Sequence, residues 1–219
     1  MNTFIGFIMG PMVWISFIVF ICGVIWKISG MIREVGEKEA YIFNYMSLKF
    51  SLRSIGAWLI PFLPRSTRQH PWFWGVTYLF HLLVFIVPIF LSAHVVLVNQ
   101  AFGISWPTLG NDVADALTVA IIGALGFFFL RRRMVPEVKF LTAPKDYILI
   151  ALVSVPFITG FLAYHQFFAY RWLTVIHVIS GELMLMLIPF SSLVHMITAP
   201  FTRAYTGSEF GGVRHARDW

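Results

Sequence analysis

Two histidines in one long apolar segment, His177 and His195, are the residues of this sequence best placed to do chemistry. They lie eighteen residues apart. Because an α-helix turns by about 100° per residue, eighteen residues make five turns and bring both imidazoles to one face, roughly 27 Å apart. A second apolar segment carries His81 and His94. Four histidines on two helices predict two stacked sites, each holding a haem iron between one histidine from each helix.

The composition indicates that these helices lie in a membrane. Hydrophobic residues make up 58% of the 219 residues, charged residues make up 12%, and the mean hydropathy is +0.79. These values lie outside the range of soluble domains. We expect an all-α integral membrane protein, a bundle of five transmembrane helices in one domain over 1–219. The expected spans are 3–26, 72–98, 113–130, 147–163 and 172–198, each about long enough to cross the hydrocarbon layer.

Lysine and arginine counts in the connecting segments predict the orientation. From the segment after the first span to the C-terminal tail, the counts are 7, 0, 5, 1 and 3. Cytoplasmic loops carry the excess of these residues. The N-terminus is therefore expected outside and the C-terminus in the cytoplasm, with a cytoplasmic loop over 28–70 and a cytoplasmic tail over 199–219. The net charge of +6 then faces anionic lipid and partner proteins, and no nucleic acid is needed to explain it.

This orientation pairs the histidines by depth. The second span runs outward, so His81 lies toward the inner half and His94 near the outer end; the fifth span runs back, so His177 lies near the outer end and His195 near the inner end. The expected pairs are His81 with His195 at an inner haem and His94 with His177 at an outer haem. The alternative is that all four are polar core residues, hydrogen-bonded between helices.

Two further features limit the cofactor and the cytoplasmic face. The sequence has one cysteine, Cys22, and no C-x-x-C-H motif, so the haems are expected to be of the non-covalent b type, and no iron–sulfur ligand set is present. The segment FSLRSIGAWLIPFLPRS within 28–70 has the pattern of an interfacial amphipathic helix that ends at Pro61 and Pro64.

The segment IHVISGELMLMLIPFSSLVHMITAP around His177 and His195 resembles the last helix of the membrane γ subunit of respiratory nitrate reductase, a five-helix di-haem cytochrome b. RRRMVPEVKFLTAPKDYILI and LFHLLVFIVPIFLSAH resemble the same family. The resemblance implies two b haems on the four histidines, a bacterial or archaeal cytoplasmic membrane, and electron transfer between a quinone pool, such as menaquinone, and a cytoplasmic redox subunit. Any oxidoreductase activity would belong mainly to the complex.

The spacing of the second-span histidines differs from that of the nitrate reductase subunit. His81 and His94 are thirteen residues apart with Pro88 between them, and an ideal helix would point them apart unless Pro88 unwinds it. His70 is the alternative ligand. This spacing is more similar to cytochrome b relatives of sulfate-reducing bacteria, which join periplasmic multihaem cytochrome c to cytoplasmic iron–sulfur proteins of the heterodisulfide-reductase type.

Other polar residues could serve quinone, propionate or proton chemistry. Glu182, inside the fifth span, is a proton-relay candidate, or a neutral carboxylic acid bonded to a neighbouring helix. Arg171 and Arg203 could pair with the propionates of the outer and inner haem, although snorkelling to lipid phosphates is the commoner role. The quinone-site candidates, each of which could equally be an ordinary interfacial residue, are Asn99, Gln100, Asp112, Tyr164, His165 and Gln166.

Three functions are therefore open. The first is a di-haem electron-transfer subunit, the second a haem-free membrane anchor, and the third a proton-coupled transporter that uses histidine and Glu182. The transporter is disfavoured because the sequence lacks inverted repeats and has one deeply placed carboxylate. Bound haem separates the first function from the other two.

Overall fold

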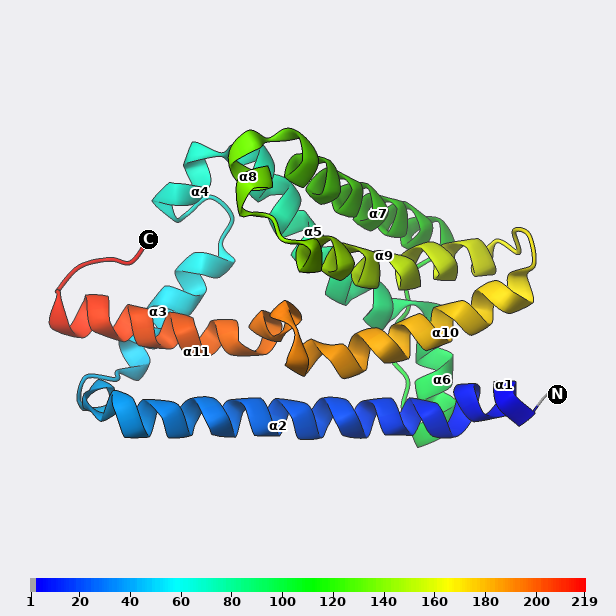
Figure 1. The fold of residues 1–219 in the computed structure, drawn as a ribbon, viewed down its shortest axis with the longest axis horizontal. Coiled ribbons are helices and arrows are strands. Elements are labelled where there is room, and N and C mark those ends of the chain that lie inside the picture. The colour runs from blue at the N-terminus through cyan, green and yellow to red at the C-terminus, as the bar shows by residue number, and fades with distance from the viewer. Residues whose placement is uncertain (1–2) are drawn as a thin grey trace. The chain divides into compact units, whose positions relative to one another are not determined.

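The computed structural model describes residues 3–219 as helices and connecting turns, with no strand in that range (Figure 1). Five helices are long and apolar enough to cross a membrane: Thr3–Lys38, Pro71–Phe90, Asn111–Met134, Pro144–Tyr164 and Tyr170–Phe190. Only a minority of the residues in each span are buried inside the chain. Because backbone groups in hydrocarbon must be satisfied internally, helices with apolar exteriors suit a lipid environment. The prediction of a five-helix, multi-pass membrane protein is confirmed.

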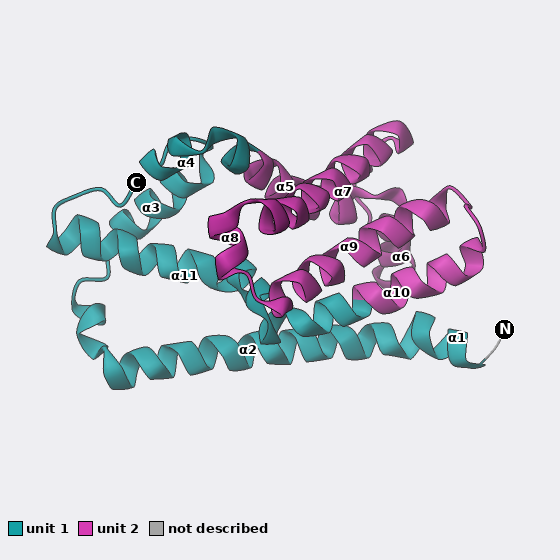
Figure 2. Ribbon diagram, turned by 45° about the horizontal axis from the view of Figure 1, so that its top comes forward, with its two compact units in different colours: residues 1–75, 182–219 teal, residues 76–181 magenta. Residues whose placement is uncertain are grey.

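The chain divides into two compact units (Figure 2). Unit 1 comprises residues 1–75 and 182–219, and unit 2 comprises 76–181. Helices α5 (Pro71–Phe90) and α10 (Tyr170–Leu187) each contribute residues to both units.

Unit 1 contains the first span and most of the polar helices. The span consists of α1 (Thr3–Phe7), a π-helical turn (Ile8–Met12) around Pro11, and α2 (Val13–Lys38). The helix thus continues twelve residues past the expected end at 26, into a stretch that carries Lys27, Arg33 and Lys38. A 3₁₀ turn (Ala40–Asn44), α3 (Leu48–Leu59) and α4 (Arg65–Gln69) follow.

The helix expected within 28–70 is present as α3, which ends just before Pro61. Its small residues Ser51, Ser54 and Ala57 are buried, whereas Leu48 and Leu59 are exposed. The buried face packs on α11 (His195–Ser208), where a Cβ on Gly207 would overlap Ser54 and the backbone of α3. The tail expected over 199–219 is largely helical, because α11 extends to Ser208 and a π-helical turn (Glu209–Val213) follows it.

Unit 2 contains the remaining spans. After α5 come α6 (Ser92–Phe102), α7 (Asn111–Met134), α8 (Pro136–Leu141) and α9 (Pro144–Tyr164), and then the first part of α10. Helix α7 packs against both α8 and α9.

The helix expected over 72–98 is broken, which corrects the prediction of one continuous span. Leu91 has an extended backbone (φ −70°, ψ 128°) between α5 and α6. Pro88, three residues earlier, has no N–H to donate and disturbs the last turn of α5. Because of the break, the carbonyls of Pro88, Ile89 and Phe90 lose their helical hydrogen bonds. Each carbonyl has another hydrogen-bonding partner instead.

These three carbonyls are satisfied by residues that follow the break. His94 Nδ1 lies 2.8 Å from the Pro88 carbonyl, Trp106 donates its indole N–H to Ile89 (2.9 Å), and the amide of Leu109 donates to Phe90 (2.9 Å). The bonds therefore hold both the break and the imidazole of His94 in place.

The fifth span is also interrupted, so the expected continuous helix over 172–198 is wrong. Helix α10 ends at Leu187, two short 3₁₀ turns (Ile188–Phe190 and Ser192–Val194) follow, and α11 begins at His195. Pro189 cannot donate a backbone hydrogen bond, and Ser191 is extended (φ −126°, ψ −178°). His177 therefore lies on α10 and His195 at the start of α11. The prediction that both lie on one face of a single helix is wrong.

Candidate functional site

Two of the four expected ligands, His94 and His177, face each other within unit 2. Their ring centres are 6.1 Å apart and the ring planes differ by 13°. Direct stacking contact would bring them to about 3.5–4.0 Å. An imidazole nitrogen binds a metal at about 2.0 Å, and its ring centre lies about 1 Å further back, so two imidazoles flanking one metal have centres about 6 Å apart. The separation between the two ring centres would therefore suit two histidines that bind one metal ion between them.

Both rings are held by backbone carbonyls at prolines. His94 Nδ1 contacts the carbonyl of Pro88, and His177 Nδ1 contacts the carbonyl of Pro156, each at 2.8 Å. A metal-binding histidine commonly donates its other ring N–H to a backbone carbonyl, which sets the tautomer and the orientation of the ring. With Nδ1 engaged in both residues, Nε2 is the nitrogen that would bind iron.

Gly160 makes the position of His177 possible. A Cβ atom at residue 160 would lie 2.8 Å from Cε1 and 2.9 Å from Nδ1 of His177, closer than real contacts allow. The imidazole of α10 therefore packs directly on the backbone of α9, one turn after Pro156. The requirement for a residue without a side chain at 160 is a tertiary feature that the spacing of the histidines did not reveal.

The other expected pair, His81 and His195, is divided between the two units, so its pairing stays a prediction. In unit 2, His81 Nδ1 lies 2.7 Å from the carbonyl of Thr77. In unit 1, His195 Nδ1 lies 2.6 Å from the carbonyl of Ser192. In both residues, as in His94 and His177, a backbone carbonyl lies at hydrogen-bond distance from Nδ1.

The alternative ligand His70 lies in unit 1, exposed between α4 and α5. Within unit 2, His94 is the histidine that faces His177. In residues 3–219 no group of three or more histidine, cysteine or acidic side chains is arranged to hold a metal ion. Two histidines are enough to hold a haem iron, and His94 and His177 could supply them.

A polar pair that the sequence analysis missed joins α7 to the end of α9. His165 Nε2 lies 3.1 Å from the Asp115 carboxylate, with both side chains about one-third exposed. The imidazole also packs on Phe161, with ring centres 4.5 Å apart. Asp115 had a signal in the sequence, since it is an acidic residue inside an apolar span; its partner depends on how α7 and α9 pack.

The other quinone-site candidates also lie in unit 2, in separate places on α6, on α7 and around the end of α9. Tyr164 contacts the ring of His165, and Gln166 has a positive φ of 55° in the turn after α9. Asn99 and Gln100 lie exposed on α6, and Asp112 lies exposed in the first turn of α7.

The structure gives the arginine and glutamate candidates different surroundings. In unit 1, the Arg203 guanidinium lies 3.7 Å from the buried Asp218 carboxylate and over the ring of Trp58. Arg203 therefore has a protein partner in unit 1, and its role beside a propionate stays a prediction. Arg171 is exposed at the start of α10.

Glu182 is 6% exposed, and its Oε1 has no hydrogen-bond partner in the described part of unit 1.

Comparison with known proteins shows a relative of nearly the same length. A protein of Nitratidesulfovibrio vulgaris (strain Hildenborough) is 36% identical over 209 residues, which cover 94% of this chain and 92% of that protein. The chain belongs to the family of that protein. The relative carries only the name "Protein", which states no activity. No family model and no solved structure matches the chain.

Proposed function

We propose that this chain is a di-haem b cytochrome subunit that passes electrons across a membrane. The observation that supports the proposal most is the facing pair His94 and His177, whose ring separation of 6.1 Å fits two axial ligands of one iron. The backbone carbonyls of Pro88 and Pro156 support it further, because they orient both rings with Nε2 as the metal-binding nitrogen.

The chain's own residues would hold and tune the outer site. His94 and His177 would bind the iron, and the apolar spans around them would exclude water. Haem b supplies reversible one-electron transfer when it is bound. Because the two imidazoles are held rigidly, little rearrangement of the protein would accompany a change in charge at the site.

The inner site of the proposed wire consists of His81 and His195. With the N-terminus outside, electrons would pass between the outer face and a cytoplasmic iron–sulfur subunit of the heterodisulfide-reductase type. The outer donor or acceptor is a menaquinone-like quinone or a periplasmic multihaem cytochrome c. Such an electron-transfer chain belongs in a bacterial or archaeal cytoplasmic membrane, which is the location of the proposed complex.

Quinone chemistry needs proton-exchanging groups, since oxidation of a quinol releases two protons together with two electrons. In unit 2 the Asp115–His165 pair provides a carboxylate and an imidazole 3.1 Å apart. The pair can accept a proton and share it between the two groups. It supports His165 over Asn99, Gln100, Asp112 and Gln166 as the residue beside a quinone ring.

The test of the proposal is a reduced-minus-oxidised absorption spectrum of the purified chain, with a pyridine haemochrome count. The expected result is two low-spin b haems per chain. A chain that is purified intact from haem-replete cells and carries no haem would overturn the proposal and return the function to a membrane anchor.

A second candidate function, proton-coupled transport, is favoured by Glu182, a buried carboxyl whose Oε1 lacks a hydrogen-bond partner within the described residues. In the electron-transfer proposal the same carboxyl is a proton relay. A buried carboxyl that binds and releases protons would serve either function.

Glu182→Gln is expected to slow quinol-dependent haem reduction by at least about tenfold and to alter its pH dependence. Gln has the shape of Glu but cannot carry the proton, so packing is retained while the relay is lost. The measurement is stopped-flow haem reduction across a pH series, with the exposed Glu37→Gln on α2 as the matched control. Unchanged rates and an unchanged pH profile would exclude the relay.

A further inference from the structure

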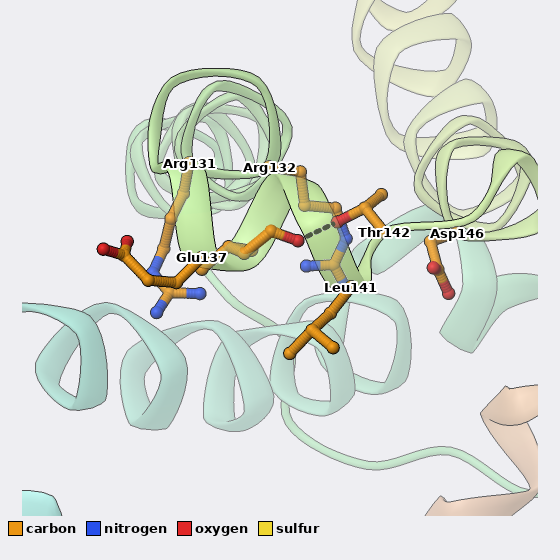
Figure 3. Close-up of a pocket in the computed structure, with 7 residues that line it drawn as sticks. Arg131, Arg132, Glu137, Leu141, Thr142 and Asp146 are labelled. Atoms are coloured by element: carbon orange, nitrogen blue, oxygen red, sulfur yellow. Dashed lines mark hydrogen bonds between the residues drawn. The ribbon is translucent and has the colours of Figure 1, made fainter.

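An open surface cavity, lined by both charged and apolar side chains, lies in unit 2 at the end of α7 and the start of α9. Its volume is about 470 Å³, and it lies between the end of α7, helix α8 and the start of α9 (Figure 3). Cavities of this size accommodate small ligands. The residues that line it are Arg131, Arg132, Glu137, Val138, Leu141, Thr142 and Asp146.

The lining carries two positive and two negative side chains. Arg131 and Arg132 supply guanidinium groups, and Glu137 and Asp146 supply carboxylates. In Figure 3 the two carboxylates lie on opposite sides of the arginines. A purely anionic ligand would be attracted by the arginines and repelled by the carboxylates. A zwitterion that carries a phosphate and an ammonium group would pair with both.

Arg132 is the residue best suited to bind a phosphate. Its Nε is buried without a hydrogen-bond partner in the part of the chain that the structure describes. This nitrogen is enclosed by the chain itself, so a phosphate would bind to the terminal N–H groups of the same guanidinium, on a side chain that lines the cavity and that suits the bidentate geometry of a phosphate. Asp146 also caps its own helix, accepting a bond from the amide of Ala143 (2.8 Å).

Apolar side chains beside the cavity identify the source of the phosphate. Met134, Phe140 and Leu141 are 74%, 89% and 80% exposed. These residues lie at the end of α7 and on α8, next to the charged lining. In a membrane protein, exposed apolar side chains face acyl chains, so the phosphates nearest to this cavity are those of phospholipids.

We propose that this cavity is a binding site for the head group of phosphatidylethanolamine. The phosphate binds to Arg132, the ammonium group donates a hydrogen bond to the carboxylate of Glu137, and the acyl chains cover Phe140 and Leu141. Ethanolamine fits better than choline because its ammonium group carries N–H donors for the carboxylate. The site is independent of haem binding.

The test is native mass spectrometry of the full chain, delipidated in detergent and titrated with lipids that share the same acyl chains. Phosphatidylethanolamine is expected to bind about tenfold more tightly than phosphatidylglycerol or phosphatidylcholine. Arg132→Gln is expected to lose about tenfold in affinity for phosphatidylethanolamine. The neighbouring Arg133, which is exposed and does not line the cavity, gives the matched control Arg133→Gln, expected to bind normally.

Glu137→Gln keeps the proposal testable if the Arg132 variant does not fold, because Glu137 is exposed. This variant is expected to lose the preference for phosphatidylethanolamine over phosphatidylglycerol. Equal affinity for the three lipids, or an equal loss in the Arg132 and Arg133 variants, would overturn the proposal. Soluble phosphoethanolamine that competes at the same concentration as the lipid would also overturn it, because the ligand would then be a free phosphate compound.

Discussion

Replacing His177 with Leu is expected to remove the outer haem, so that the haem content of the purified chain falls from two to about one. His94→Leu is expected to have the same effect, because each residue supplies one of the two axial nitrogens. The measurement is the pyridine haemochrome count together with the low-spin signals in electron paramagnetic resonance. A haem bound by the proposed inner pair, His81 and His195, is expected to remain in both variants and to report that the chain is folded.

His70→Leu is the matched control for these variants. It removes the alternative histidine, which is exposed in unit 1, and is expected to leave both haems in place. Two unchanged low-spin haems in the His94 variant, or loss of a haem in the His70 variant, would contradict the ligand assignment. If the wild type carries both haems, such a result would leave the proposed electron-transfer function standing. It would overturn only the assignment of the histidine ligands.

Replacing Gly160 with Ala is expected to disrupt the outer site although no ligand is changed. The new methyl group would lie 2.8 Å from Cε1 of His177. The imidazole must then move and weaken its bond to the Pro156 carbonyl. We expect loss of the outer haem and destabilisation by about 1–3 kcal/mol, typical of overpacking. Thermal unfolding and the haem count of the variant measure these two effects.

Gly126→Ala is the control for this substitution. Gly126 lies inside α7, and a Cβ there would meet no atom within 4 Å among the described residues. Alanine is a better helix former than glycine by roughly 1 kcal/mol, so this variant is expected to be as stable as the wild type or slightly more stable. If Gly160→Ala behaved in the same way and retained both haems, the close packing of His177 on α9 would not matter for the site.

The membrane character and the five spans could be predicted from the sequence because both depend on local composition. An apolar stretch of about twenty residues must form a helix in hydrocarbon whatever packs beside it. Span ends were less predictable. Helix α2 continues to Lys38 because charged residues can continue a helix beyond the apolar region.

The helix breaks were only partly predictable. Pro88 indicated a disturbance in the second span, but the break itself lies at Leu91. In the fifth span, Pro189 and Ser191 interrupt what the apolar pattern predicted as one helix. A proline lowers the stability of the turn that contains it. Where the chain then bends depends on which donors reach the released carbonyls, and those donors include Trp106 and Leu109, more than fifteen residues away.

The sequence by itself determined that this is a helical membrane protein. It predicted histidines at matching depths, with His94 and His177 as one pair. Only the tertiary structure decided that these two rings face each other at 6.1 Å, that Pro88 and Pro156 orient them, and that Gly160 makes room for one of them. It also brought His165 to Asp115. Residue types and helical periods are local properties, whereas contacts between helices depend on how bent helices pack, which no single segment encodes.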